Sequence, residues 1–497
     1  MQERYIASVD LGSTKIALSV AKVTGENVQV IYYKEAPSDG IRYSCVFNPK
    51  RAAAPLKRLI AEAESELGIK ILQAVVGLPR YNVHQETSSA TLTRSNPETC
   101  IEQEEIEVLK SEALNSYPLD NESKEEIYGA VAQSFSADDL IQQSEIDVVG
   151  ATADKVDGNF KIFVGERKAS YNIDILFNEV EVAPAHKIFL PDAVASAVLR
   201  EDEKENGVAL IEIGGGVTSV TIYQGKLLRY YKAIPFGGRN VTTDIKYEGG
   251  FKESLAENIK LAFGACIPEK IPSLGEKIIQ INDDETGTYQ QLPVKYLSEV
   301  ITCRVKEILD AILYLIQDSG FAERLRCGVV LTGGCANLAN ICTLVKEMSG
   351  YNVRMGYPRS CNFSSAGCFG TNETGAAASI GLILAAKADN YLNCTTEKAP
   401  DPEMLEEPEM AEEPEEEEIK EAESYENTIF DTEAHRVEKP RKSVRTEKPR
   451  TVRTKPPKPT KPSFLNIIWN TKIKDGLSEA FDGVVGNLYD QLEDGNE

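Results

Sequence analysis

The chain has 497 residues, of which 42% are hydrophobic and 27% are charged, and its formal net charge is −24. This length suffices for two or more hydrophobic cores, and the acidic balance argues against nucleic acid as a partner of the folded body, because neutralising phosphates requires a basic face. The N-terminus has no signal-peptide pattern, and no apolar run approaches the roughly 20 residues that span a bilayer. The ten cysteines include no CxxC pair, so we expect reduced thiols in a cytoplasmic protein.

Two hairpins of one pattern stand out, in which an apolar strand carries an acid and then passes through glycine into a second strand. The first copy reads ASVDLGSTKIALSV and contains Asp10, Gly12, Ser13, Thr14 and Lys15. The second copy reads VALIEIGGGVTSVTIY and contains Glu212, Gly214, Gly215, Gly216 and Thr218. Glycine tips let backbone N–H groups approach an anion, and Lys15 adds a positive charge, which suits a polyphosphate. An ordinary tight turn explains one glycine cluster equally well, but two copies favour a duplicated domain whose tips face one cleft.

A third glycine pair, Gly333-Gly334, follows the apolar run at 329–331 and precedes Asn337. Together the three segments resemble the phosphate-1, phosphate-2 and adenosine motifs of the actin, Hsp70 and sugar-kinase superfamily, and the resemblance covers roughly residues 3–390. Within it the chain looks most like the FtsA family of bacterial cell-division proteins, because of DLGSTKI, IEIGGGVTSVTIY, IPFGGRNVTTDI and the C-terminal tail. The resemblance implies an α/β fold of the actin-like ATPase type, in which two duplicated RNase H-like domains flank a cleft that binds ATP and Mg²⁺.

The resemblance also implies roles for individual side chains. Asp10 and Glu212 would hold Mg²⁺ through water, and the alternative for Asp10 is a carboxylate that hydrogen-bonds its own turn. Asp192 begins the helix predicted at 190–199, near the place where relatives orient the attacking water, but capping of the helix explains it equally well. Many relatives have Asp where this chain has the longer Glu212, so we expect slow or absent ATPase activity. The further nucleotide contacts implied are Gly238, Glu257, Lys260, Gly333, Gly334 and Asn337. For the Glu-x-x-Lys pair, a surface ion pair is the alternative.

The resemblance and the changes in sequence texture predict four subdomains. Subdomain 1A covers 1–83 and 360–392, subdomain 1C is inserted at 84–168, subdomain 2A covers 169–235 and 300–359, and subdomain 2B covers 236–299. Within 84–168 the pattern predicts a helix at 102–114, strands at 127–135, 146–156 and 160–164, and a turn at Asp157-Gly158-Asn159. In FtsA proteins, 2B receives the C-terminal peptide of the tubulin-like protein FtsZ. Subdomain 1C would be a surface for other division proteins or a neighbouring protomer, and the alternative is a rigid spacer.

Two helices and a tail complete the chain. Small residues in the helix at 190–199 predict close packing on a partner, and the Ala- and Gly-rich segment at 373–386 resembles the second of the two helices that connect the halves. Residues 393–462 read as a disordered linker, acidic and then basic. At 463–497 an amphipathic helix after a basic linker indicates a membrane anchor, and the alternative is a helix that docks in a partner's groove. The predicted membrane-facing residues are Phe464, Leu465, Ile468, Trp469, Lys472, Ile473 and Lys474. The acids beyond 481 depart from the short basic tails typical of the family.

We therefore expect an ATP-binding actin-like protein that self-associates into filaments. It would be a peripheral protein on the cytoplasmic face of the inner membrane at the division site, where it anchors the FtsZ ring and recruits other division proteins. The alternatives are a sugar-kinase-like enzyme and an Hsp70-like chaperone of the same superfamily. A kinase gives no reason for an amphipathic tail, and a chaperone needs a β-sandwich after residue 390, which the Glu-, Pro- and Lys-rich linker cannot form.

Overall fold

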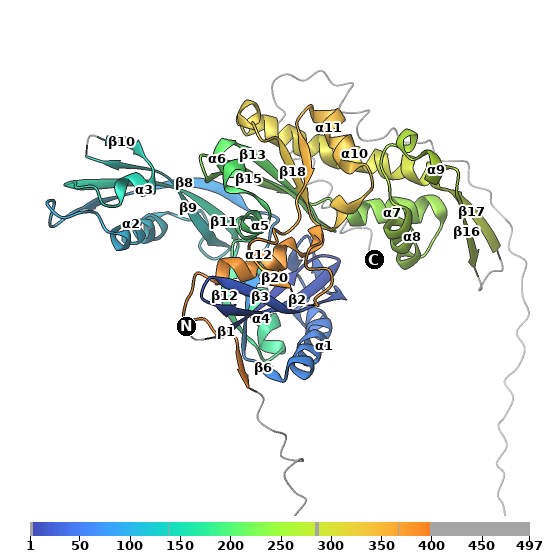
Figure 1. Cartoon of the computed structure of the whole chain (residues 1–497), viewed down its shortest axis with the longest axis horizontal. Coiled ribbons are helices and arrows are strands. Elements are labelled where there is room, and N and C mark those ends of the chain that lie inside the picture. The colour runs from blue at the N-terminus through green and yellow to red at the C-terminus, as the bar shows by residue number, and fades with distance from the viewer. Residues whose placement is uncertain (1–2, 139, 284–287, 366, 398–497) are drawn as a thin grey trace, which may run out of the picture. The chain divides into compact units, whose positions relative to one another are not determined.

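The computed structural model describes residues 3–138, 140–283, 288–365 and 367–397 (Figure 1). Most of the predicted linker at 393–462 and the whole of the predicted anchor segment at 463–497 lie outside the described residues. The same is true of the predicted membrane-facing residues Phe464, Leu465, Ile468, Trp469, Lys472, Ile473 and Lys474. None of the described helices is both long enough and apolar enough to cross a membrane.

A six-stranded sheet is built around the first hairpin. Its order is β12 (Ala183–Ile188), β7 (Gln73–Gly77), β1 (Arg4–Leu11), β2 (Lys15–Thr24), β3 (Asn27–Pro37) and β20 (Ser364–Ser365). β1 runs antiparallel to β2 and parallel to β7. β1 and β2 are buried along almost their whole length, as expected of strands covered on both faces. Helices α1 (Pro49–Leu67) and α12 (Ala377–Ala386) pack on this sheet. Gly68, with φ of 67°, ends α1 as a left-handed C-cap.

A second sheet repeats this arrangement around the second hairpin. Its order is β15 (Leu227–Ile234), β14 (Thr218–Gln224), β13 (Val208–Ile213), β18 (Val329–Thr332) and β19 (Val353–Met355). β13 runs antiparallel to β14 and parallel to β18, as β1 does to β2 and β7. The helices packed on it are α6 (Glu201–Asn206), α10 (Val294–Asp318) and α11 (Ile341–Ser349). The shared strand order and directions confirm the duplication that the two hairpins predicted.

Helices α5 (Leu190–Val198) and α12 pack directly on each other (Figure 1). A Cβ added at Gly381 of α12 would lie 2.3 Å from the backbone oxygen of Ala193 in α5. Only glycine allows the two backbones to come so close. The close packing predicted for the helix at 190–199 is therefore confirmed, and the Ala- and Gly-rich segment supplies its partner.

The first sheet includes residues that the sequence had assigned to subdomain 2A. Helix α4 (Arg167–Glu179) and strand β12 fall almost wholly in the range 169–235 that was assigned to subdomain 2A. Yet β12 pairs in parallel with β7 of the first sheet, and α4 packs against α1. The pairing partner of a short strand depends on tertiary contacts, which the local pattern does not carry. β12 is the counterpart of β19, the outer strand of the second sheet. The other subdomain limits stay predictions.

The segment predicted as subdomain 1C forms its own sheet, in the order β10 (Leu140–Gln143), β9 (Glu125–Ala137), β11 (Lys155–Glu166) and β8 (His84–Thr93). It also contains α2 (Gln103–Ser116), which confirms the predicted helix, and α3 (Glu145–Val148). The predicted turn at Asp157-Gly158-Asn159 is wrong, because β11 runs through it and pairs with β8 and β9 on either side. A Cβ at Gly158 would lie 2.7 Å from the Phe160 ring and 2.8 Å from Leu109. The glycine thus serves close packing between α2 and the sheet.

The segment 236–299 contains α7 (Gly238–Gly249), α8 (Glu253–Phe263) and a two-stranded hairpin. β16 (Ile278–Asp283) and β17 (Thr288–Pro293) pair antiparallel, and residues 284–287 between them lie outside the described residues. Strand β21 (Thr395–Glu397) pairs with β6 (Ile69–Ile71), and β4 (Ile41–Arg42) pairs with β5 (Cys45–Val46). The remaining short elements are α9 (Pro272–Gly275), η1 (Pro268–Lys270), η2 (Ala322–Arg324), η3 (Gly334–Asn337) and η4 (Thr374–Ala376). All ten cysteines lie in the described ranges and are free.

Candidate functional site

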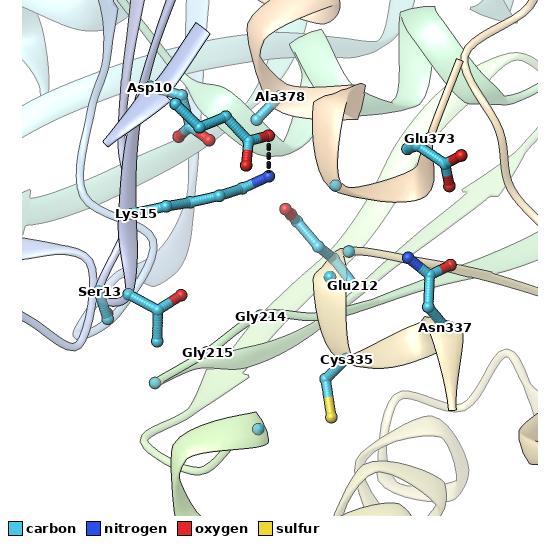
Figure 2. Close-up of a pocket in the computed structure, with 18 of the residues that line it drawn as sticks. Asp10, Ser13, Lys15, Glu212, Gly214, Gly215, Cys335, Asn337, Glu373 and Ala378 are labelled. Carbon is cyan, nitrogen blue, oxygen red and sulfur yellow. Dashed lines mark hydrogen bonds and ion pairs between the residues drawn. The ribbon is translucent and has the colours of Figure 1, made fainter. Parts of the chain in front are cut away.

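A cavity of about 780 Å³ lies where the two glycine hairpins meet. Figure 2 shows Asp10, Ser13 and Lys15 on one side of the pocket and Glu212 and Asn337 on the other. The predicted site residues that line the cavity are Asp10, Gly12, Ser13, Thr14, Lys15, Glu212, Gly214, Gly215, Gly216, Gly238, Glu257, Lys260, Gly333, Gly334 and Asn337. The fold thus brings together the three glycine segments, which are far apart in the sequence.

The tip of the first hairpin is held by local contacts. Leu11 pairs with Ile16 across β1 and β2, so residues 12–14 make the turn. A Cβ at Gly12 would lie 2.6 Å from the carbonyl oxygen of Lys15. The Ser13 hydroxyl accepts a hydrogen bond from the Ser44 N–H at 2.9 Å. The Lys15 ammonium forms an ion pair with Glu35 of β3, and the dashed line in Figure 2 marks this pair. An anionic ligand would compete with this carboxylate for the lysine.

The glycines of the second hairpin are needed for packing against the first hairpin, a role that the sequence did not reveal. A Cβ at Gly215 would lie 2.3 Å from the Thr14 methyl carbon, and a Cβ at Gly216 would lie 2.8 Å from Ser13 Oγ. The two hairpin tips therefore touch, and glycine in one tip makes room for side chains in the other. The carbonyl oxygen of Gly215 also accepts a hydrogen bond from the Arg239 N–H at 2.7 Å. This bond ties the tip to the first turn of α7.

An arginine that the sequence analysis did not single out lies between the two predicted carboxylates. Arg80 Nη2 is 3.1 Å from Glu212 Oε1 and 3.5 Å from Asp10 Oδ1, and the three side chains are only 7–10% exposed. Burial raises the pKa of Glu212, the Arg80 charge opposes this rise, and Asp10 adds to it. Burial by itself lowers the pKa of Arg80, but the two carboxylates outweigh it and the pKa is raised. The guanidinium is thus a permanent positive charge at this end of the cavity.

The sequence around Arg80 has no motif, and its place at the cavity can be inferred only once the strand order of the two sheets is known. Arg80 follows β7, and β7 occupies in the first sheet the place that β18 occupies in the second. Because Gly333-Gly334 after β18 is a predicted site segment, the duplication places the residues after β7, including Arg80, at the equivalent position of the first half. The other lining residues that were missed include Tyr33, Glu35, Glu373 and Gly375. Glu35 lies on a strand without a motif, and Glu373 begins the segment at 373–386, whose pattern indicated a connecting helix and not a site.

The predicted pair Glu257 and Lys260 forms on one face of α8. Lys260 Nζ lies 2.8 Å from Glu257 Oε2, and the lysine side chain is 8% exposed. The same ammonium donates to the Gly238 carbonyl at 3.0 Å and to Thr242 Oγ1 at 2.8 Å. A buried lysine with three oxygen partners is not the surface ion pair that was the alternative. It fixes α8 against the start of α7 at the wall of the cavity.

The third glycine segment continues from β18 into η3. Gly333 has φ of 91°, which favours glycine, and a Cβ there would lie 2.5 Å from the Ile213 carbonyl oxygen. Thr374 Oγ1 lies 2.9 Å from the Gly333 carbonyl oxygen and 2.9 Å from Asn337 Oδ1. The hydroxyl therefore joins η3 to η4, and Asn337 is held at the cavity by this contact.

Two predicted site residues do not line the cavity. Asp192 lies in the first turn of α5, where its Oδ1 accepts a hydrogen bond from the Tyr223 hydroxyl at 2.5 Å. Thr218 is fully buried, and its hydroxyl donates to the Phe236 carbonyl at 2.8 Å. The proposed roles of Asp192 in catalysis and of Thr218 in nucleotide binding therefore find no direct support in the geometry.

The fit of Mg²⁺ to the predicted pair Asp10 and Glu212 is poor in this arrangement. Mg²⁺ is commonly held by one or two carboxylates together with water and phosphate oxygens. Here the guanidinium of Arg80 already lies against both carboxylates, and a second cation beside it would be repelled. Arg80 Nε is buried and donates to no described atom, so what this donor lacks is an oxygen. Among the described residues, no three His, Cys, Asp or Glu side chains gather closely enough to hold a metal ion.

Comparisons with known proteins agree with this fold and with the resemblance seen in the sequence. The family model described as cell division protein FtsA matches residues 209–379. The chain is 27% identical over 72% of its length to the cell division protein FtsA of Neisseria meningitidis, and the match covers 85% of that protein. It is 28% identical over 73% of its length to the FtsA of Borreliella burgdorferi, with 86% of that protein covered.

Among solved structures, a chain of a PilM–PilN type IV pilus biogenesis complex superposes with a TM-score of 0.54 at 14% identity. The match covers 77% of this chain and 98% of that one. At this identity the similarity shows the fold alone. The expected α/β fold of the actin-like ATPases is confirmed, and so is the resemblance to the FtsA family of cell-division proteins.

Proposed function

We propose that this protein binds ATP or ADP in the cavity between its duplicated halves and acts as an actin-like tether in cell division. The observation that carries the proposal is the meeting of two glycine hairpins, one from each half, at a single cavity of about 780 Å³. A site made of both halves couples ligand binding to their relative position. Similarity to FtsA proteins supports the cell-division role.

The lining residues suit the parts of a nucleotide in a definite order. The phosphates would lie by the two hairpin tips, where Lys15 supplies a positive charge and glycines leave the backbone accessible. The ribose and base would lie by Glu257, Lys260 and the glycine pair at 333–334, which line the other part of the cavity. The Glu257 carboxylate is 36% exposed and is free to accept hydrogen bonds from ribose hydroxyls.

Slow or absent hydrolysis is part of the proposal. Glu212 is held by Arg80, and Asp192 is held by Tyr223 outside the cavity lining. Each carboxylate is therefore already engaged by a partner, which we expect to make it less available to orient a water molecule. We expect phosphate release below about 1 per second, a lower value for typical enzymes. Faster multiple-turnover release would favour an enzyme of the same superfamily.

The division role needs three further interactions. We propose that the protein assembles into filaments, that segment 236–299 receives the C-terminal peptide of FtsZ, and that segment 84–168 contacts other division proteins or a neighbouring protomer. The C-terminal residues Phe464, Trp469 and their neighbours would anchor the filament on the cytoplasmic face of the inner membrane. One weak membrane contact per protomer would suffice, because linked sites along a filament bind with avidity.

The nucleotide part is tested by calorimetric titration of the full chain with ATP, ADP and GTP. We expect saturable binding of ATP and ADP at one site per chain. The variant Glu257→Gln should weaken adenine nucleotide binding, whereas Glu98→Gln on the exposed surface of the inserted segment should not. Absence of any binding would refute the proposal.

The membrane part is tested by co-sedimentation with anionic liposomes, comparing the full chain with a chain truncated before Ser463. We expect ATP to enhance pelleting of the full chain and truncation to abolish it. Equal pelleting of both chains, or pelleting of neither, would contradict the tether and favour a soluble enzyme.

A further inference from the structure

We propose that Arg80 is a built-in cation at the phosphate end of the cavity and that it makes nucleotide binding independent of Mg²⁺. The inference rests on the proposed nucleotide site and adds to it how the charge of that site is balanced. In place of a divalent cation between two carboxylates, the chain supplies a guanidinium of its own.

The fold fixes Arg80 in this place. Arg80 follows β7, which runs parallel to β1, so the ends of both strands meet at one edge of the first sheet. The Leu78 N–H donates to the Ile188 carbonyl of β12 at 2.8 Å, which anchors the segment just before the arginine. The carbonyl oxygen of Arg80 accepts a hydrogen bond from the Tyr231 hydroxyl. Tyr231 belongs to β15 of the second sheet, so Arg80 is held from both halves.

Aromatic packing keeps the Tyr231 contact rigid. Its ring is 1% exposed and packs edge-on against Phe189 at 5.4 Å and against Phe163 at 6.4 Å between centroids. Edge-to-face pairs at such distances are favourable. The arginine backbone is therefore positioned before any ligand arrives.

The charges around Arg80 then decide what else can bind. Asp10 comes from the first half and Glu212 from the second, and both lie within 3.5 Å of one guanidinium nitrogen. Two carboxylates and one guanidinium leave one excess negative charge in place of two, which lowers the repulsion that phosphates would meet. A divalent cation between the same carboxylates would have to displace a buried guanidinium or lie beside it. Displacing Arg80 would break a buried ion pair, which is strongly unfavourable.

Arg80 is thus a positioning residue that acts through Asp10 and Glu212. Its guanidinium contacts Asp10 at the end of β1 and Glu212 of β13. It therefore bridges the two halves at the place where a divalent cation between these carboxylates would have done so. The Nε of the same side chain is buried and donates to no described atom, so it is a hydrogen-bond donor left over for an oxygen of the ligand.

The test is a calorimetric titration of the full chain with ATP in excess MgCl₂ and in excess EDTA, for the wild type, Arg80→Gln and Arg80→Lys. We expect the two dissociation constants of the wild type to agree within about threefold. In Arg80→Gln, ATP binding should become dependent on Mg²⁺, with a ratio of about tenfold or more between EDTA and MgCl₂. Arg80→Lys keeps the charge and should stay closer to the wild type. Arg51→Gln, at an arginine that is 61% exposed, is the matched control and should show the wild-type ratio.

The outcomes separate this inference from the proposed function. Binding of ATP by the wild type only in MgCl₂ would overturn the role of Arg80 and leave the nucleotide site intact. An Mg²⁺ ratio unchanged by Arg80→Gln would also overturn it. No ATP binding under either condition would refute the nucleotide site itself. If Arg80→Gln does not fold, as judged by its thermal unfolding, the ratio measured for the wild type and for Arg80→Lys decides.

Discussion

The two halves of the body share a strand order but contribute differently to the cavity. Both sheets have the same spatial order, namely an outer parallel strand, then a central parallel strand, then the hairpin. At the cavity, the first half presents Ser13, Thr14, Lys15 and Arg80 beside the single tip glycine Gly12. The second half presents a tip of three glycines at 214–216, the glycine pair at 333–334 and the side chains of Glu212, Glu257 and Lys260. The strands therefore fix where the site lies, and the residues at their ends decide what each half supplies.

The difference also explains why the halves fit together. Side chains of one tip occupy the space left by glycines of the other. The same device recurs away from the cavity, where Gly381 of α12 meets the backbone of α5. Glycine thus allows close contact both at the hairpin tips and at the crossing of α5 and α12.

The largest effect is expected at the crossing of α5 and α12. In Gly381→Ala, the new Cβ would meet the Ala193 carbonyl oxygen at 2.3 Å. Overpacking costs about 1–3 kcal/mol, and a clash between two backbones should reach the upper end, about 3 kcal/mol. Urea unfolding of the variant measures this loss. Gly275→Ala, whose Cβ would meet only ordinary contacts at 3.8 Å, is the control, and an equal loss in both variants would refute the explanation.

A smaller effect is expected where the hairpin tips touch. Gly215→Ala places a methyl group against Thr14, so the tips must separate. We expect ATP affinity to fall by about tenfold, or 1.4 kcal/mol. Thr14→Ala removes the groups that clash, and the double variant should recover part of the loss. If the two substitutions are simply additive in a double-mutant cycle, the tips do not act through this contact.

Ion pairs at the outer strands β12 and β19 of the two halves should make the free energy of unfolding depend on pH. In the first half, Lys187 pairs with Asp174 at 2.7 Å, and both side chains are partly exposed. In the second half, Arg354 of β19 pairs with Glu203 at 2.6 Å, and that carboxylate is 2% exposed. Burial raises the pKa of Glu203, but hydrogen bonds from Arg354 and from the backbone outweigh it and leave the pKa below its ordinary 4.5.

A lowered carboxyl pKa means that the folded state binds the proton more weakly than the unfolded state does. The stability due to Glu203 is therefore fully present above pH 4.5 and is lost as the pH falls through the lower pKa of the folded state. Glu203→Gln should lower the free energy of unfolding at neutral pH by about 1–3 kcal/mol, because the Arg354 charge loses its partner. The difference from the wild type should shrink in acid. Asp174→Asn, the counterpart in the first half, should show a smaller difference, and the reverse order would contradict the comparison.

The smallest effect on stability is expected at Lys15. Its ion pair with Glu35 is exposed by about a third on each side, and such pairs contribute about 0–1 kcal/mol. Lys15→Met should therefore leave the free energy of unfolding almost unchanged, while ATP affinity falls by about threefold. Lys70→Met, at a lysine that pairs with Glu64 and does not line the cavity, should change neither. A loss of stability without loss of affinity would mean that Lys15 serves the fold alone.

The sequence predicted what depends on local pattern. The alternation and glycines of both hairpins, the amphipathic period of α2 and the small residues of the two connecting helices were enough to predict these elements. The triple glycine was read as an anion site, yet its neighbours Ser13 and Thr14 show a packing reason that only the folded contact reveals. The turn predicted at Gly158 was wrong for a similar reason. A glycine required for close packing cannot be distinguished in sequence from a glycine required for a turn.

What could not be predicted depends on contacts between distant segments. Arg80 meets Asp10 and Glu212 only after two sheets have formed and faced each other. The pairing of β12 with β7 likewise depends on a crossover through α4. Asp192 was a reasonable candidate by its place at a helix start, but its contact with Tyr223 could not be seen.

Hydrogen–deuterium exchange of the full chain with and without ATP tests the central claim most directly, namely that one ligand is bound by both halves. The account predicts slower exchange on ATP binding at 11–15, at 213–218 and at 333–338 together, and no change in the sheet of β8, β9 and β11. Slower exchange in the segments of one half only, or in none of the three, would contradict it.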